Sequence, residues 1–187
     1  ALLFYAGWEL IIVGLLCVLF AFLYTTGPYP LSYNGWGDVL VIVFFGFVPV
    51  GGTYYVQALT WTSDTTVASL ICGLLIDTLL VVNNYRDREA DARSGKRTVI
   101  VRFGEKFGRY LYLMLGMTAS LLCFWFFFEG HLFAALLPLL YLIPHVLTWR
   151  RMVQIHSGKK LNSILGETSR NMLLMGILLS IGFLIRH

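Results

Sequence analysis

Long apolar runs separated by short polar segments dominate the pattern of this 187-residue chain. A helix needs about 20 mostly apolar residues to cross the hydrocarbon core of a bilayer. Six segments satisfy or approach that length and predict transmembrane helices: residues 2–24, 36–61, 67–83, 110–128, 132–149 and 169–185. The third is the shortest, and we expect its helix to continue beyond the bilayer from Asn83 to Ala92.

The fold class follows from what lipid permits. Backbone polar groups in a bilayer must be paired within helices or closed barrels. The roughly ten-residue alternation of barrel strands is missing from this sequence. We therefore predict an all-α, polytopic transmembrane helix bundle and a single transmembrane domain over residues 1–187.

Composition excludes an ordinary soluble domain. The chain is 58% hydrophobic and 13% charged, whereas a soluble domain carries about 25% charged residues. This much apolar surface must face lipid, which makes membrane lipid an expected partner. The net charge of +4 does not indicate nucleic-acid binding, because the charges lie between the apolar runs.

The basic residues predict the orientation. Of 14 Lys and Arg residues, eight lie between residues 86 and 109 and five between 150 and 170, which leaves only Arg186 elsewhere. Six spans place both regions, and the uncharged residues 25–35, on one side of the membrane. By the positive-inside rule that side is cytoplasmic.

Proline and glycine interrupt the first two spans. The sequence Gly-Pro-Tyr-Pro at residues 27–30 should end the first helix. Pro49, followed by Gly51 and Gly52, predicts a kink near the middle of the second span. Such a kink is either a packing device or a means of opening a cavity, and the sequence leaves both open.

The polar continuation of the third span carries the candidate chemistry. Asn83, Asp87 and Asp91 recur at intervals of four, so a continuous helix places an amide and two carboxylates along one face. Such hard oxygen ligands suit Mg²⁺, which completes its shell with water and phosphate oxygens. Lys96 and Arg97 could pair with phosphate. The spacing equally fits a solvated helix end whose carboxylates pair with nearby arginines.

Two stretches resemble a known family. Residues 83–87, Asn-Asn-Tyr-Arg-Asp, continue to Asp91 and to Gly-Lys-Arg-Thr at 95–98. This pattern resembles the second aspartate-rich motif of the UbiA superfamily of intramembrane prenyltransferases, in the form typical of 1,4-dihydroxy-2-naphthoate polyprenyltransferases of menaquinone biosynthesis. The segments 24–30, 35–38 and 52–57 are similar to that family's fourth and fifth helices and the loop between them.

The resemblance implies a nine-helix fold around a central cavity, with two aspartate-rich motifs. The first motif, of the form NDxxDxxxD, is missing from this sequence. The six predicted spans would match the family's helices four to nine. We therefore expect that the chain starts within a longer protein, that three N-terminal helices precede it, and that it is inactive alone.

The implied reaction is Mg²⁺-dependent transfer of a polyprenyl group from polyprenyl diphosphate to 1,4-dihydroxy-2-naphthoate. Carbon dioxide and pyrophosphate are lost and demethylmenaquinone forms, at the cytoplasmic face of a bacterial inner membrane. The expected metal ligands are Asp87, Asp91 and Asn83. The expected catalytic residues are Asp87, Asp91 and two tyrosines that could stabilise a carbocation, Tyr54 and Tyr55. The expected substrate-binding residues are Asn83, Asn84, Arg86, Lys96, Arg97, Gln57 and Tyr24.

The sequence leaves other functions open. A related prenyltransferase could use another aromatic acceptor, such as 4-hydroxybenzoate or a chlorin. A transporter or a non-catalytic membrane subunit is a different class, but a transporter usually places its functional charges near mid-membrane. Among the remaining polar residues, we expect Asp77 to have a packing role and His145 to form helix–helix hydrogen bonds. Asp38 resembles a position of the family, and the alternative is that it simply caps its helix.

The expectation of a longer protein has a direct test. Reading the coding sequence upstream of Ala1 should reveal about 100 further residues with two or three apolar spans and an NDxxDxxxD segment. A start codon at or just before Ala1 would contradict it.

Overall fold

The computed structural model describes residues 6–185, and every regular element within them is helical. The prediction of an all-α polytopic bundle is confirmed. The elements in chain order are α2 (Glu9–Thr25), η1 (Leu31–Asn34), α3 (Gly37–Val41), η2 (Ile42–Gly51), α4 (Gly52–Ala58), α5 (Ser63–Arg93), α6 (Val99–Leu122), α7 (Trp125–Phe128), α8 (Leu132–Leu136), η3 (Leu137–Tyr141), α9 (Leu142–Ile155), η4 (Lys159–Leu161) and α10 (Asn162–Leu184).

Several of these elements join into longer rods. Five helical stretches among the described residues are long and apolar enough to cross a membrane: Gly37–Ala58, Ser63–Arg93, Val99–Phe128, Leu132–Ile155 and Lys159–Leu184. They correspond to the second to sixth predicted spans. The first predicted span appears as α2, which is apolar but has only 17 residues. Residues 2–5 of that prediction lie outside the described part of the chain.

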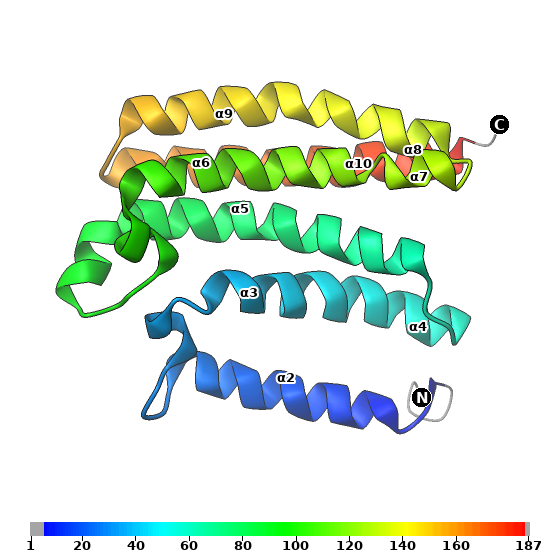
Figure 1. Ribbon diagram of the computed structural model, residues 1–187, viewed down its shortest axis with the longest axis horizontal. Coiled ribbons are helices and arrows are strands. Elements are labelled where there is room, and N and C mark those ends of the chain that lie inside the picture. Colours follow the sequence, from blue (N-terminus) through cyan, green and yellow to red (C-terminus); the bar gives the residue numbers. More distant parts are fainter. Residues whose placement is uncertain (1–5, 186–187) are drawn as a thin grey trace.

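The rods lie side by side, and their connections alternate between two ends of the bundle (Figure 1). Residues 26–36, 94–98 and 156–158 connect helices at one end, which we call the basic end. Residues 59–62 and 129–131 connect them at the opposite, far end. The 13 basic residues between 86 and 170 lie in the basic-end connections or in the helical turns next to them.

Helix α5 occupies the centre of the bundle and packs against α3, η2, α6 and α10. The expectation that this helix continues from Asn83 to Ala92 is confirmed, because α5 is one helix of 31 residues that ends at Arg93. At 1.5 Å per residue its length is about 46 Å, whereas the hydrocarbon core is about 30 Å thick. Its apolar part, including Ile71, Val81 and Val82, is buried in the core. A helix of this length can therefore extend beyond the hydrocarbon core at its polar end.

The second span carries the irregularity predicted around Pro49, in the form of the π-helical segment η2. A proline lacks a backbone N–H, and π-helical turns are one way in which membrane helices accommodate that loss. Val50, beside Pro49, lines a groove of about 780 Å³ that lies mainly between α5 and α10. The irregular segment therefore borders a cavity as well as a packing interface.

Glycines allow η2 and α5 to touch backbone to backbone. A Cβ built on Gly46 would lie 2.5 Å from the Ser69 carbonyl oxygen and 2.8 Å from the Cα of Gly73. A Cβ on Gly73 would lie 2.9 Å from the Cα of Ile42. Small residues are the usual means of such close approach between membrane helices. These contacts fix an antiparallel register in which Ile42 faces Gly73.

Helices α6 and α9 are joined by a buried histidine, as expected. His145 has no exposed surface. Its Nδ1 accepts a hydrogen bond from the Tyr141 hydroxyl (2.9 Å), and its Nε2 donates to the Leu113 carbonyl (3.2 Å). Gly116 provides the space, because a Cβ there would overlap the imidazole.

The close contact at Gly46 predicts that one added methyl group there destabilises the fold. Gly46→Ala should lower the free energy of unfolding by about 1–3 kcal/mol, because the two backbones must separate. Thermal unfolding in detergent micelles would measure the change.

Gly176→Ala in α10 is the matched control, since a Cβ there meets nothing within 4 Å. It should leave stability unchanged or slightly raised, because alanine favours a helix over glycine. Equal behaviour of the two variants would contradict the close packing.

Candidate functional site

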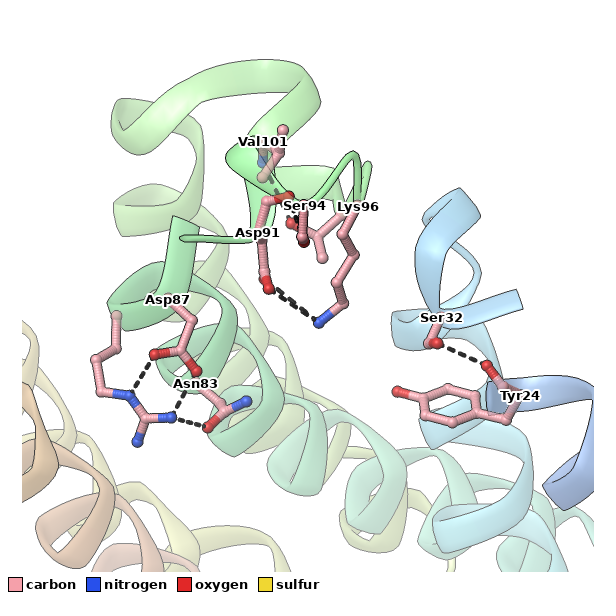
Figure 2. Close-up of polar contacts among 10 residues, drawn as sticks. Tyr24, Ser32, Asn83, Asp87, Asp91, Ser94, Lys96 and Val101 are labelled. Atoms are coloured by element: carbon pink, nitrogen blue, oxygen red, sulfur yellow. Dashed lines mark hydrogen bonds and ion pairs between the residues drawn. The ribbon is translucent and has the colours of Figure 1, made fainter. Parts of the chain in front are cut away.

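The last turns of α5 carry a network of polar contacts around Arg86. Its guanidinium donates to both carboxylate oxygens of Asp87, at 2.8 and 2.6 Å, and to Oδ1 of Asn83 at 2.8 Å. It also donates to Oδ1 of Asn162 at the start of α10, at 2.9 Å. Figure 2 shows Asn83 and Asp87 converging on this one cation. The predicted shared face of Asn83 and Asp87 is thus present, with Arg86 between their oxygens.

One turn further, Asp91 pairs with a lysine from the following loop. Lys96 Nζ lies 3.4 and 3.3 Å from the two oxygens of Asp91, whose side chain is only 13% exposed. The chain reverses at Gly95, whose φ of +77° favours glycine. The Lys96 amide then donates to the Asp91 carbonyl at 2.9 Å, which completes the turn. The Gly-Lys sequence therefore folds the lysine back over the end of α5.

The two family-like stretches, far apart in sequence, meet at this turn. The Arg97 amide donates to the Tyr33 carbonyl at 2.7 Å, and Arg102 donates to the Asn34 carbonyl at 2.7 Å. Between the stretches lies a small polar cavity, lined by Tyr24, Ser32, Gly35, Gly37, Asp38, Asn84, Lys96 and Thr98. In Figure 2 the Tyr24 side chain lies on the side of its helix that faces Lys96. The predicted residues Tyr24, Asn84 and Lys96 are therefore brought together.

An apolar groove begins directly beneath the carboxylates. It has a volume of about 470 Å³, lies between η2, α5 and α10, and has Asn83 among its lining residues. Ile76 and Ser169 line both this groove and the 780 Å³ groove that continues along α10 to Ile181. Together they form an apolar track that starts at the polar end of α5. Ser169 and the α10 part of this track were missed by sequence reasoning, because α10 carries no motif.

Three predicted site residues lie at the other end of the molecule. Tyr54, Tyr55 and Gln57 belong to α4, next to the start of α5. The distance along α5 from Ser63 to Asp87 is about 36 Å. Gln57 donates only to the Thr53 carbonyl of its own helix, at 3.0 Å, and Tyr54 is 39% exposed. The structure does not bring these three residues to the carboxylates.

Two carboxyl groups lie opposite each other between α3 and α5, that of Asp77 buried and that of Asp38 partly buried. Asp77 is 1% exposed, and the Oδ1 atoms of both Asp38 and Asp77 are buried without a hydrogen-bond partner among the described residues. Because Ile42 faces Gly73, one helical turn in opposite directions places Asp38 opposite Asp77. The alternative that Asp38 simply caps its helix is wrong, since Trp36 occupies the N-cap position and no side-chain cap bond forms. Only the packing register could have revealed this pair.

The carboxylates suit a metal ion only as part of a larger set. Asn83, Asp87 and Asp91 supply hard oxygen donors along one face, as Mg²⁺ requires. Within residues 6–185, however, there is no group of three or more His, Cys, Asp or Glu residues that could hold a metal ion. Further oxygen donors, such as those of a diphosphate, would be needed. The exposed Arg97 guanidinium has no ion-pair partner among the described residues and is free to meet such a group.

Comparisons with known proteins place the chain in a family. The sequence model of the UbiA prenyltransferase family matches residues 1–182. A 1,4-dihydroxy-2-naphthoate octaprenyltransferase of Haemophilus influenzae is 36% identical over 180 residues, which is 92% of this chain and 56% of that protein. Proteins of the same name from Mycobacterium tuberculosis and Escherichia coli are 44% and 41% identical, over 64% and 60% of this chain and 40% and 36% of theirs.

The chain thus spans about half the length of the curated relatives that it matches. No solved structure matches it.

The placement of Asp77 opposite Asp38 predicts that replacing Asp77 by its uncharged isostere asparagine does not destabilise the protein. A carboxyl group buried in apolar surroundings is far cheaper to hold neutral than ionised. Asp77→Asn should therefore leave the thermal midpoint in detergent unchanged or raise it, because the amide can donate to Asp38. A large loss of stability would show instead that an ionised Asp77 is required.

Proposed function

Because the chain belongs to the UbiA prenyltransferase family, we propose that its protein transfers a polyprenyl group from polyprenyl diphosphate to 1,4-dihydroxy-2-naphthoate. Carbon dioxide and pyrophosphate are released, and the product is demethylmenaquinol, the hydroquinone form of the menaquinone precursor demethylmenaquinone. The names of relatives that are 36–44% identical support this choice of substrates. The active face is the cytoplasmic face of a bacterial inner membrane, in keeping with the basic residues gathered at that end.

One observation carries the proposal: an apolar track begins where the carboxylates of α5 end. Asn83 lines the groove between η2, α5 and α10. Asp87 and Asp91 follow Asn83 along α5 by about one and two helical turns, toward the basic end. A polyprenyl diphosphate has the same division, with an anionic head and a long apolar tail. The head would lie at Asp87, Asp91 and Lys96, and the tail would follow the grooves between α5 and α10.

The diphosphate head requires positive charge on its oxygens. Asp87, Asp91 and Asn83 would hold Mg²⁺, which would neutralise the charge that develops on the leaving pyrophosphate. Further oxygen donors beyond these three side chains would complete the ligand set. Arg86, Lys96 and Arg97 add direct contacts to diphosphate oxygens, for which the exposed Arg97 is already unpaired among the described residues.

Each carboxylate of the site is paired with a neighbouring cation. In the structure, Arg86 neutralises Asp87 and Lys96 neutralises Asp91. Asp87 and Asp91 would hold the metal ion that accompanies a diphosphate, and Arg86 and Lys96 would donate to the diphosphate oxygens.

The residues around the grooves protect the reactive carbon. Cleavage of the allylic C–O bond leaves the electron pair on pyrophosphate and an allylic cation that water would trap. The apolar side chains of η2, α5 and α10 exclude water along the tail. The electron-rich naphthoate ring then attacks the cation. Tyr24 and Asn84, which line the polar cavity beside Lys96, would contact the polar groups of this acceptor. Tyr54, Tyr55 and Gln57 remain a sequence-based prediction that no step here uses.

Removing either carboxylate should abolish turnover without unfolding the protein. In the protein expressed from its complete coding sequence, Asp87→Asn or Asp91→Asn should lower kcat roughly 100-fold or more, because leaving-group charge is no longer stabilised. Prenyl transfer to 1,4-dihydroxy-2-naphthoate with excess Mg²⁺ would measure the change. Chelation of divalent cations should stop the wild-type reaction, and Mg²⁺ should restore it.

Glu89→Gln is the matched control, because Glu89 lies on the same helix, is exposed and has no ion pair among the described residues. It should keep nearly full activity. If all three variants behaved alike, the transferase site would not lie on this face, and a non-catalytic membrane subunit or a transporter would become the better interpretation.

A further inference from the structure

A further groove, separate from the two that form the apolar track, lies between α9 and α10. It is near the basic end, and no residue of α5 lines it. It has a volume of about 460 Å³, and all of its lining residues belong to these two helices: Pro144, Leu147, Thr148, Arg150, Arg151, Gln154, Glu167, Arg170 and Asn171. Its inner wall is fixed by a hydrogen bond of 2.9 Å from Asn171 Nδ2 to Thr148 Oγ1. The proposed transferase site uses none of these residues.

The groove has an excess of positive charge. It contains three arginines and one carboxylate. Arg151 is neutralised by Glu167, whose side chain is only 10% exposed and lies 2.6 Å away. Arg150 and Arg170 are exposed and have no ion-pair partner among residues 6–185. Two guanidinium groups, one from each helix, are therefore free to bind an anion between them.

The surface beside and within the groove changes from apolar to basic along η3 and α9. Leu140, Ile143 and Leu147 form an exposed stripe at helical spacing, with exposed fractions of 52%, 63% and 53%. The stripe continues into Arg150 and Gln154 toward the basic end. This order places apolar side chains where lipid tails lie and guanidinium groups where headgroup phosphates lie.

We propose that this groove binds an anionic phospholipid. Its phosphate lies between Arg150 and Arg170, Gln154 donates to headgroup oxygens, and one acyl chain follows the stripe of Leu140, Ile143 and Leu147. A free phosphate or pyrophosphate would match the arginines but would leave the apolar stripe unused. Basic pockets between transmembrane helices on the cytoplasmic side commonly bind such headgroups. The bound lipid would hold α9 and α10 together at the membrane surface.

The test compares two pairs of charge removals. The protein from its complete coding sequence is purified in a neutral detergent and titrated with phosphatidylglycerol or phosphatidylcholine of the same acyl chains. Native mass spectrometry then counts the bound lipids. Arg150→Gln combined with Arg170→Gln should weaken phosphatidylglycerol binding about 30-fold, since each basic residue near the surface contributes about 1 kcal/mol. Binding of phosphatidylcholine should not change.

Lys159→Gln combined with Lys160→Gln is the matched control, because it removes the same charge from η4, outside the groove. It should lower phosphatidylglycerol binding much less. Equal losses in the two double variants would overturn the proposal in favour of general surface attraction. Displacement of phosphatidylglycerol by millimolar pyrophosphate would also overturn it, because the site would then hold a free phosphate.

A third variant keeps the test independent of the arginines' effect on folding. Gln154→Glu adds a negative charge inside the groove and should weaken phosphatidylglycerol binding. The elution profile of the purified protein in size-exclusion chromatography, which reports folding, should stay unchanged. Unchanged binding in this variant would count against the groove as the headgroup site. None of these measurements depends on prenyl transfer, so the proposed lipid site and the proposed transferase activity are tested independently.

Discussion

The length of α5 relative to the bilayer is the constraint on which the site depends. Its apolar part must stay within the hydrocarbon, so the turns after Asn83 can extend into the polar region at the basic end. There the carboxylates of Asp87 and Asp91 pair with Arg86 and Lys96, although they lie directly above an apolar groove. A donor with a charged head and a long apolar tail needs this boundary. The helix provides it without any separate soluble domain among the described residues.

Contacts between helices convert this boundary into a site. The Gly46 and Gly73 contact brings η2 against α5, which forms one wall of the groove beneath Asn83. The reversal at Gly95 brings Lys96 onto Asp91 and docks the loop on residues 33–34. Both devices rely on glycine, once for close approach and once for a positive φ. Backbone geometry at a few positions thus controls where the charged side chains lie.

Charged side chains are arranged differently at the end of α5 and in the groove between α9 and α10. Around α5, each carboxylate has its own cation, so the site is nearly neutral. Between α9 and α10, one arginine is paired with Glu167 and two are not, which leaves a lasting positive charge. The first arrangement suits a ligand that comes and goes during turnover. The second suits a lipid that remains bound.

The sequence by itself determined the helical bundle, the basic end, the continuation of α5 and the shared face of Asn83 and Asp87, because each depends on local spacing or on length against the bilayer. It could not place Tyr54 at the end away from the carboxylates, nor pair Asp38 with Asp77, because both depend on the register between helices. The apolar track and the α9–α10 groove were likewise decided only by tertiary packing. Their walls come from segments far apart in the chain, and no local pattern encodes which faces meet.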